Sequence, residues 1–156
     1  MAIGTVQKYD GFEYALGHSG NRAWDDATTG NIMWCLADET YTPSDAHSTT
    51  NDVSTALITT GDGVPINATG LAIDKTTTAG TTYYDSDDAN FGTSVTITAK
   101  YLIAVQPVTA GTFSGTTDVL LFYVDLDTTS GSSTVSSAPD FIILAPTNGW
   151  LSSAQA

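Results

Sequence analysis

Apolar and polar residues alternate over several short stretches of the chain, and the clearest of them predict β-strands. Residues 94–106 (SVTITAKYLIAVQ) open with Val95, Ile97, Ala99 and Tyr101 at every second position, as in a half-buried strand. Residues 31–37 (NIMWCLA) are almost continuously apolar, which is typical of a central strand. The other predicted strands are 12–17 (FEYALG), 118–126 (DVLLFYVDL), 141–144 (FIIL) and two weaker ones, 71–74 and 82–85.

Turn signals rather than helices separate these stretches. Gly61-Asp62-Gly63, 109–111 and 130–133 are rich in Gly, Ser and Thr. The only helix we expect is a short one at about 45–57, with Ser44 or Asp45 as its N-cap.

The pattern therefore predicts an all-β fold, a β-sandwich or jelly-roll-like single domain with at most one short helix. Within that domain, residues 1–30 form an extended N-terminal arm with the first strand, and residues 31–151 form the β-sandwich. We expect the inward face to carry large residues of the apolar strands: Trp34, Leu36, Ile97, Tyr101, Ile103, Leu121, Tyr123 and Ile143.

The net charge of the chain disfavours some classes of binding partner. Four basic residues face 17 acidic ones, so the formal net charge is −13. Nucleic acids and anionic membranes are poor partners for such a surface, because both are bound through Lys and Arg. No apolar run reaches the roughly 18 residues of a membrane span, and no signal-peptide-like segment opens the chain, so we expect synthesis and folding in a cytoplasm. The single cysteine, Cys35, lies in an apolar run and is interpreted as a core residue.

Candidate chemistry is sparse. Asp45 and His47 could begin a metal site, but zinc needs three or four converging ligands, so we interpret the pair as a helix cap with a locally hydrogen-bonded histidine. The acids Asp85, Asp87 and Asp88 resemble a calcium loop without its central Gly and closing Glu, which leaves a solvated turn and an ion site as alternatives.

No G-x-S-x-G, P-loop or G-x-G-x-x-G motif occurs, and we expect neither a cofactor nor enzymatic activity. A glycosidase-like pair of carboxylates stays open as an alternative, since the separation of acids in space is invisible in a sequence.

The aromatic residues offer a binding role. Trp24, Trp34, Trp150 and the pair Tyr83-Tyr84 could form a platform that stacks on sugars. They could equally be packing residues, because Trp and Tyr carry large apolar area wherever they lie. We place Trp34 in the core, whereas Trp24 and Trp150 lie in loop or terminal segments and could anchor a neighbouring subunit.

Several short motifs, in order, resemble a family of small structural proteins of tailed bacteriophages. The motifs are Tyr41-Thr42-Pro43, Asp45-Ala46-His47, Asp52-Val53, Asp87-Asp88 and the run 96–101 (TITAKY), and the resemblance spans about 31–127. Lys100 stands where the family pattern has Arg, and both ends of the chain match poorly.

This resemblance implies a virion structural protein made in the host cytoplasm. The favoured expectation is a capsid decoration (cement) protein that binds the outer surface of the major capsid protein as a homo-oligomer, most simply a trimer; a tail, neck or receptor-binding component is the alternative. The expected interface residues are Lys8, Tyr9, Phe12, Arg22, Trp24 and Trp150. Pro43, Asp45 and His47 are expected to shape a turn and its cap.

Overall fold

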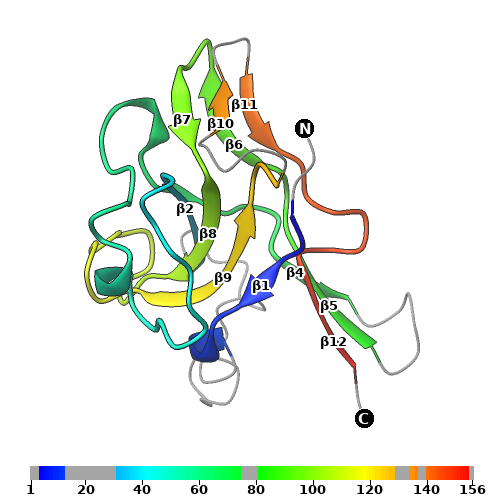
Figure 1. Cartoon of the computed structure of the whole chain (residues 1–156). Helices are drawn as coiled ribbons and strands as arrows, with labels where there is room; N and C mark the ends of the chain where they lie inside the picture. Colours follow the sequence, from blue (N-terminus) through cyan, green and yellow to red (C-terminus); the bar gives the residue numbers. More distant parts are fainter. Residues whose placement is uncertain (1–3, 13–30, 75–80, 129–133, 137–139, 155–156) are drawn as a thin grey trace.

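The computed structural model describes residues 4–12, 31–74, 81–128, 134–136 and 140–154, and its strands confirm the all-β prediction (Figure 1). A five-stranded antiparallel sheet in the order β1-β9-β8-β2-β3 forms the centre. Its strands are β1 (Gln7–Lys8), β2 (Met33–Ala37), β3 (Ile66–Asn67), β8 (Tyr101–Gln106) and β9 (Val119–Asp125). The apolar run at 31–37 is thus a central strand, as its continuous hydrophobicity predicts.

Three smaller antiparallel sheets accompany the central one. They comprise β12 (Leu151–Ala154), β5 (Thr81–Asp85) and β4 (Ala72–Asp74); β11 (Asp140–Ile143) and β6 (Ala89–Thr93); and β10 (Thr134–Ser136) and β7 (Ile97–Ala99). In Figure 1 the sheet with β12, β5 and β4 extends at the lower right, while β7, β10, β6 and β11 lie at the upper end. The predicted strands 71–74, 82–85, 118–126 and 141–144 are confirmed to within two residues.

The single strand predicted at 94–106 is wrong in one respect, because it divides at Lys100 into β7 and β8. β7 pairs with β10, whereas β8 pairs with β2 and β9. The Lys100 backbone bridges the two neighbours of β8: its N–H donates to the Ala37 carbonyl, and its own carbonyl accepts from the Leu126 N–H. One continuous alternating stretch therefore serves two sheets.

Both faces of the central sheet are buried, which corrects the prediction of one inward face. Trp34, Leu36 and Leu102 point into a large cluster with residues of β5, β6, β7, β11 and β12. Cys35 and Ile103, one position along on the same strands, belong to a second cluster on the opposite face. Of the eight predicted core residues, Ile103 is buried on this second face, and Tyr101 and Tyr123 pack there only partly buried. Alternation assigns residues to faces but does not reveal that loops cover the second one.

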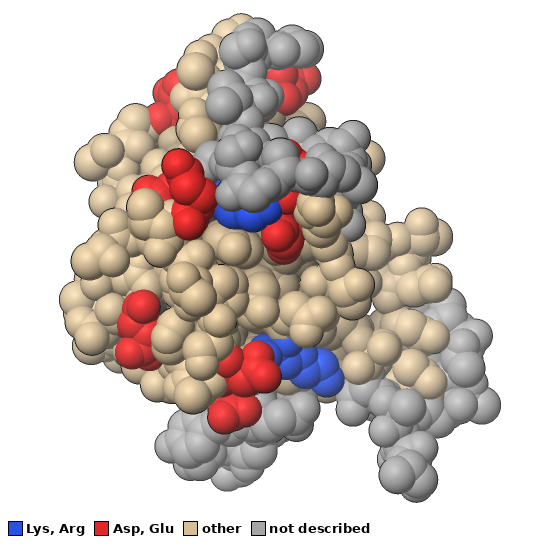
Figure 2. Space-filling view, viewed as in Figure 1, with Lys and Arg blue, Asp and Glu red and all other residues tan. Residues whose placement is uncertain are grey.

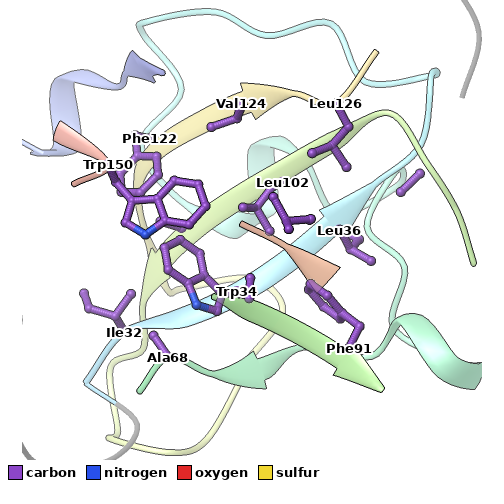
Figure 3. Packing of buried hydrophobic residues seen from close by; sticks show 14 of the residues in the cluster. Ile32, Trp34, Leu36, Ala68, Phe91, Leu102, Phe122, Val124, Leu126 and Trp150 are labelled. Atoms are coloured by element: carbon purple, nitrogen blue, oxygen red, sulfur yellow. The ribbon is translucent and has the colours of Figure 1, made fainter. Parts of the chain in front are cut away.

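Aromatic rings occupy one end of the large cluster (Figure 3). The centroids of the Trp34 and Trp150 rings are 4.9 Å apart, and Phe122 lies within 6.1 Å of Trp150. Each of these side chains is at most 3% exposed. Burial of three such rings removes a large apolar area from water, so this contact is a main source of stability.

The helix predicted at 45–57 is also wrong in length and in its cap. The chain forms only a 3-10 helix, η1 (Thr50–Asp52), followed by turns; a second one, η2 (Gly61–Gly63), lies further on. Thr49, not Ser44 or Asp45, is the N-cap, and the Asp52 carboxylate accepts the N–H groups of Ser48 and Thr49. The acid that satisfies the open N–H groups comes from inside the helical turn rather than from before it.

The predicted strand at 12–17 meets the described residues only at Phe12, which is helical together with 10 and 11; residues 13–17 lie outside them. β1, β3, β6, β10 and β12 were not predicted, because they are short or polar and gain their pairing from distant strands.

Candidate functional site

The stretch from Tyr41 to His47 folds into a hydrogen-bonded chain of side chains. The Tyr41 hydroxyl lies 2.8 Å from the Tyr9 hydroxyl and 2.9 Å from His47 Nδ1, and is hydrogen-bonded to both. The His47 N–H also donates to the Ser44 carbonyl, which closes the turn after Pro43. The prediction that His47 hydrogen-bonds locally is confirmed. Asp45 lies in that turn, and its expected role as a helix cap is wrong.

Two further tyrosines surround this chain. The rings of Tyr41 and Tyr101 meet edge-on at 5.6 Å, and the Tyr123 ring lies 5.2 Å from that of Tyr9. Burial raises the pKa of Tyr41 to about 12 and that of Tyr9 well above its ordinary value. Both hydroxyls therefore stay protonated at neutral pH, and the chain acts as a tether between the Tyr9 segment and the 41–47 turn.

The 41–47 turn does not form a recognisable metal site. Within the ranges given above, no three His, Cys, Asp or Glu side chains are grouped closely enough to hold a metal ion. The two groups that the sequence placed beside each other, Asp45 and His47, thus lack converging partners among the described residues.

Lys100 forms a second polar arrangement. Its Nζ lies 2.9 Å from Asp125 Oδ1 and also donates to the Asp127 carbonyl. The lysine side chain is 7% exposed, against 29% for that of Asp125. The Asp127 N–H donates to Asp125 Oδ1, which holds the carboxylate in place. This ion pair fastens the end of β9 to the point where β7 passes into β8.

Asp118 is a third polar centre, and its role was not predicted. Its side chain is fully buried and accepts the backbone N–H groups of Val108, Ser114 and Gly115. Its own N–H donates to the hydroxyl of Thr50, which is also fully buried. The carboxylate therefore organises the β8–β9 loop, and the backbone of the same residue joins the loop to η1. An acid directly before an apolar strand was the only available clue.

The acidic turn between β5 and β6 adjoins an open depression of about 530 Å³. Asp87 and Asp88 line it, together with Thr69, Asn90 and Ile142. Asp87 Oδ2 accepts the Thr69 hydroxyl at 2.9 Å, and Asp88 Oδ1 accepts the Ala145 N–H at 2.8 Å. Gly70 has a φ of +61°, and a Cβ at this position would collide with the Asp87 carboxylate. Of the turn predicted at Asp85 to Asn90, only Ser86 to Asp88 lie between strands, because Asp85 belongs to β5 and Ala89 and Asn90 belong to β6.

Three of the six expected interface residues lie in the core. Tyr9, Phe12 and Trp150 are at most 3% exposed, so they cannot serve as exposed contacts. The Trp150 Nε1–H donates to Ser86 Oγ, and this hydrogen bond explains how a tryptophan near the end of the chain is buried at its polar edge. Lys8 is half-buried with its Nζ 5.3 Å from the centroid of the Phe12 ring. Arg22 and Trp24 lie outside the described residues.

The sugar-stacking platform is not formed as expected. Trp34, Trp150 and Tyr84 are buried, and only Tyr83 of the described members is half-exposed. Cys35 is fully buried, and burial raises the pKa of its thiol well above the ordinary value, which confirms its interpretation as a core residue.

Charge on the surface is unevenly distributed. Figure 2 shows Asp and Glu atoms in separate groups on this face, with lysine atoms beside some of them and broad uncharged areas between. None of the helices within the described part of the chain has the length and hydropathy to cross a bilayer. Comparisons with protein families, with curated proteins and with solved structures find no match.

Proposed function

We propose that this chain is a structural protein of a bacteriophage particle, and that it decorates the outer surface of the capsid as a homo-oligomer. The observation that carries the proposal concerns the motif residues that resemble the phage family. Tyr41 is hydrogen-bonded to Tyr9 and Lys100 pairs with Asp125, so both hold distant segments together. His47 and Asp52 shape their own turns through local hydrogen bonds. Motif residues that stabilise the fold are typical of a structural protein, which functions through its shape and its surface.

Two further features support a structural role over a catalytic one. Asp52, Asp118 and Asp125 bind backbone N–H groups or Lys100, so these acids are used to hold the fold. The formal net charge of −13 makes contact with packaged DNA unfavourable, so the proposed position is outside the shell. Repetition on a closed shell then multiplies contacts that are weak one by one.

The interface that we propose differs from the one expected from sequence. Arg22 and Trp24 remain candidates for contact with the major capsid protein, and Lys8 remains one with a half-exposed side chain. Tyr9, Phe12 and Trp150 are not part of the proposed interface, because their side chains are buried in the core of the chain itself.

The test is to add the purified protein to phage particles that lack it and to measure its occupancy and position by electron microscopy. We expect symmetric density on the capsid exterior, together with an oligomer, most simply a trimer, in sedimentation velocity. Density at the tail or neck would overturn the capsid placement in favour of a tail component. No density anywhere on the particle would overturn the structural role altogether.

A further inference from the structure

The outward face of β11 carries exposed apolar residues where polar ones are the norm. Phe141 and Ile143 point into the large core cluster, whereas Asp140 and Ile142 point outward. Ile142 is 39% exposed, and Leu144, two positions further along, is 65% exposed. Neighbouring apolar residues on the solvent side of a strand are typical of an interaction surface.

Two oriented carboxylates lie beside these apolar side chains. Ile142 lines the same depression as Asp87 and Asp88. The Asp88 carboxylate is hydrogen-bonded to the N–H of Ala145, the residue after Leu144. We call the combination the β11 patch, made of Asp87, Asp88, Asn90, Ile142 and Leu144.

The carboxylates of the β11 patch have no cationic partner among the described residues. Lys100 pairs with Asp125, and neither it nor Lys8 pairs with Asp87 or Asp88. Each acid is held through one oxygen by one donor, the Thr69 hydroxyl or the Ala145 N–H. Two negative groups are thus fixed in position next to exposed aliphatic side chains.

We propose that the β11 patch binds an extended segment of a partner protein in which a Lys or Arg stands beside aliphatic residues. The cation would lie against Asp87 and Asp88, and the aliphatic side chains would cover Ile142 and Leu144. The segment would cross the depression that Asp87, Asp88, Asn90 and Ile142 line, over the outward face of the β6–β11 pair.

Charge argues for such a partner rather than for a second copy of this chain. Each copy carries 17 acids and four bases, and a two-fold contact through the β11 patch would oppose the same carboxylates. The identity of the partner rests on the proposed function, which would make it a segment of a capsid protein. The binding chemistry itself does not depend on that placement.

The experiment measures fluorescence anisotropy with the full chain and a labelled six-residue peptide, Ile-Ser-Lys-Ser-Ile-Ser, which places lysine and isoleucine on one face of an extended segment. We expect saturable binding that weakens about tenfold in the double variant Asp87→Asn and Asp88→Asn, because charge-assisted hydrogen bonds to the peptide ammonium are lost. Asparagine keeps an oxygen for the Thr69 hydroxyl and for the Ala145 N–H, so the turn should stay folded. Leu144→Ser should weaken binding about fivefold, through lost apolar contact.

Matched controls come from exposed residues outside the β11 patch. Asp10→Asn removes an exposed carboxylate near β1, and Val108→Ser removes a side chain that is 70% exposed in the β8–β9 loop. Neither should change the affinity, and a peptide with glutamate in place of lysine should not bind. Circular dichroism of every variant checks that it is folded.

Three results would overturn the proposal. One is no binding of the lysine–isoleucine peptide at millimolar concentration, and another is equal affinity for the native chain and the patch variants. The third is loss of self-association in Leu144→Ser, measured by sedimentation velocity, which would assign the patch to a contact between copies. None of these assays uses phage particles, so this inference can fail while the capsid proposal stands, or the reverse.

Discussion

Replacement of Asp118 by alanine should destabilise the chain through loss of the centre that organises the β8–β9 loop. The carboxylate accepts three backbone N–H groups, from Val108 at 3.2 Å, Ser114 at 2.7 Å and Gly115 at 3.4 Å. The residue is fully buried, and its backbone N–H and carbonyl are both bonded to Thr50. Asp118→Ala therefore leaves donors without an acceptor next to the core.

The magnitude follows from these distances. A hydrogen bond to a charged group contributes about 1.5–3 kcal/mol. We expect the 2.7 Å bond to contribute an amount within that range. The bonds at 3.2 and 3.4 Å are long and contribute less. Val108 and Ser114 lie at the surface, so water can replace part of what is lost. We expect a loss of about 3 kcal/mol for alanine, and about half of that for asparagine, which keeps one acceptor oxygen.

Urea denaturation at fixed pH measures this loss, with hydrogen exchange of the Ser114 amide as a local probe. A loss of about 3 kcal/mol should lower the urea midpoint by roughly 1.5 M and abolish protection at Ser114. Asp62→Ala is the matched control, because this exposed acid of η2 accepts a single backbone N–H, from Thr96 at 3.3 Å. The reasoning is refuted if Asp118→Ala costs no more than Asp62→Ala, for which we expect less than about 0.5 kcal/mol.

Three other outcomes are expected. Lys100→Met should lower the free energy of unfolding by about 2 kcal/mol, because the carboxylate of Asp125 loses its cation but can partly rehydrate; an unchanged urea midpoint would contradict this. The folded-state pKa of Tyr41, about 12, exceeds the ordinary 10.0, so its stabilising contribution is present below pH 10 and is lost as the pH rises through about 12. A urea midpoint measured against pH should fall over this interval, and Tyr41→Phe should lessen the fall; an identical fall in both proteins would exclude Tyr41 as its cause. Cys35 should react with a thiol reagent only at the rate of unfolding, and rapid labelling of the native chain would show that its segment opens locally.

Much of the fold could be predicted because the strands that form the core carry their own signal. β2, β8 and β9 are long and apolar, and each lies within a predicted stretch. The acidic turn was predicted in part: Asp and Ser favour turns, but the predicted stretch Asp85 to Asn90 ran into β5 and β6 at its two ends. β6, in contrast, carries Asn90 and Gly92 and gains its pairing from β11, about 50 positions later in the chain. Nothing local distinguishes such a strand from a loop.

The candidate site shows the same division. Tyr41, Pro43 and His47 lie close together in the sequence, so a local structural role could be predicted for them. The third member of the hydrogen-bonded chain, Tyr9, comes from 32 positions earlier, and only the fold brings it there. Asp118 gave no advance signal, because the N–H groups that it accepts become its partners only when the loop closes.

The sequence by itself determined the strand-rich class, the acidic surface and the burial of the apolar runs, because these depend on composition and on alternation along short segments. Tertiary structure alone decided which aromatic residues are available at the surface. Trp150 looks like a terminal anchor in the sequence but packs against Trp34, and Phe12 looks like part of an arm but meets Tyr84 edge-on at 5.5 Å. The physical reason is that an aromatic side chain gains free energy equally from a core and from a partner, so its fate depends on whether distant strands leave space for it. Ile142 and Leu144 are exposed for a different reason: side chains alternate between faces, and Phe141 and Ile143 take the inward positions.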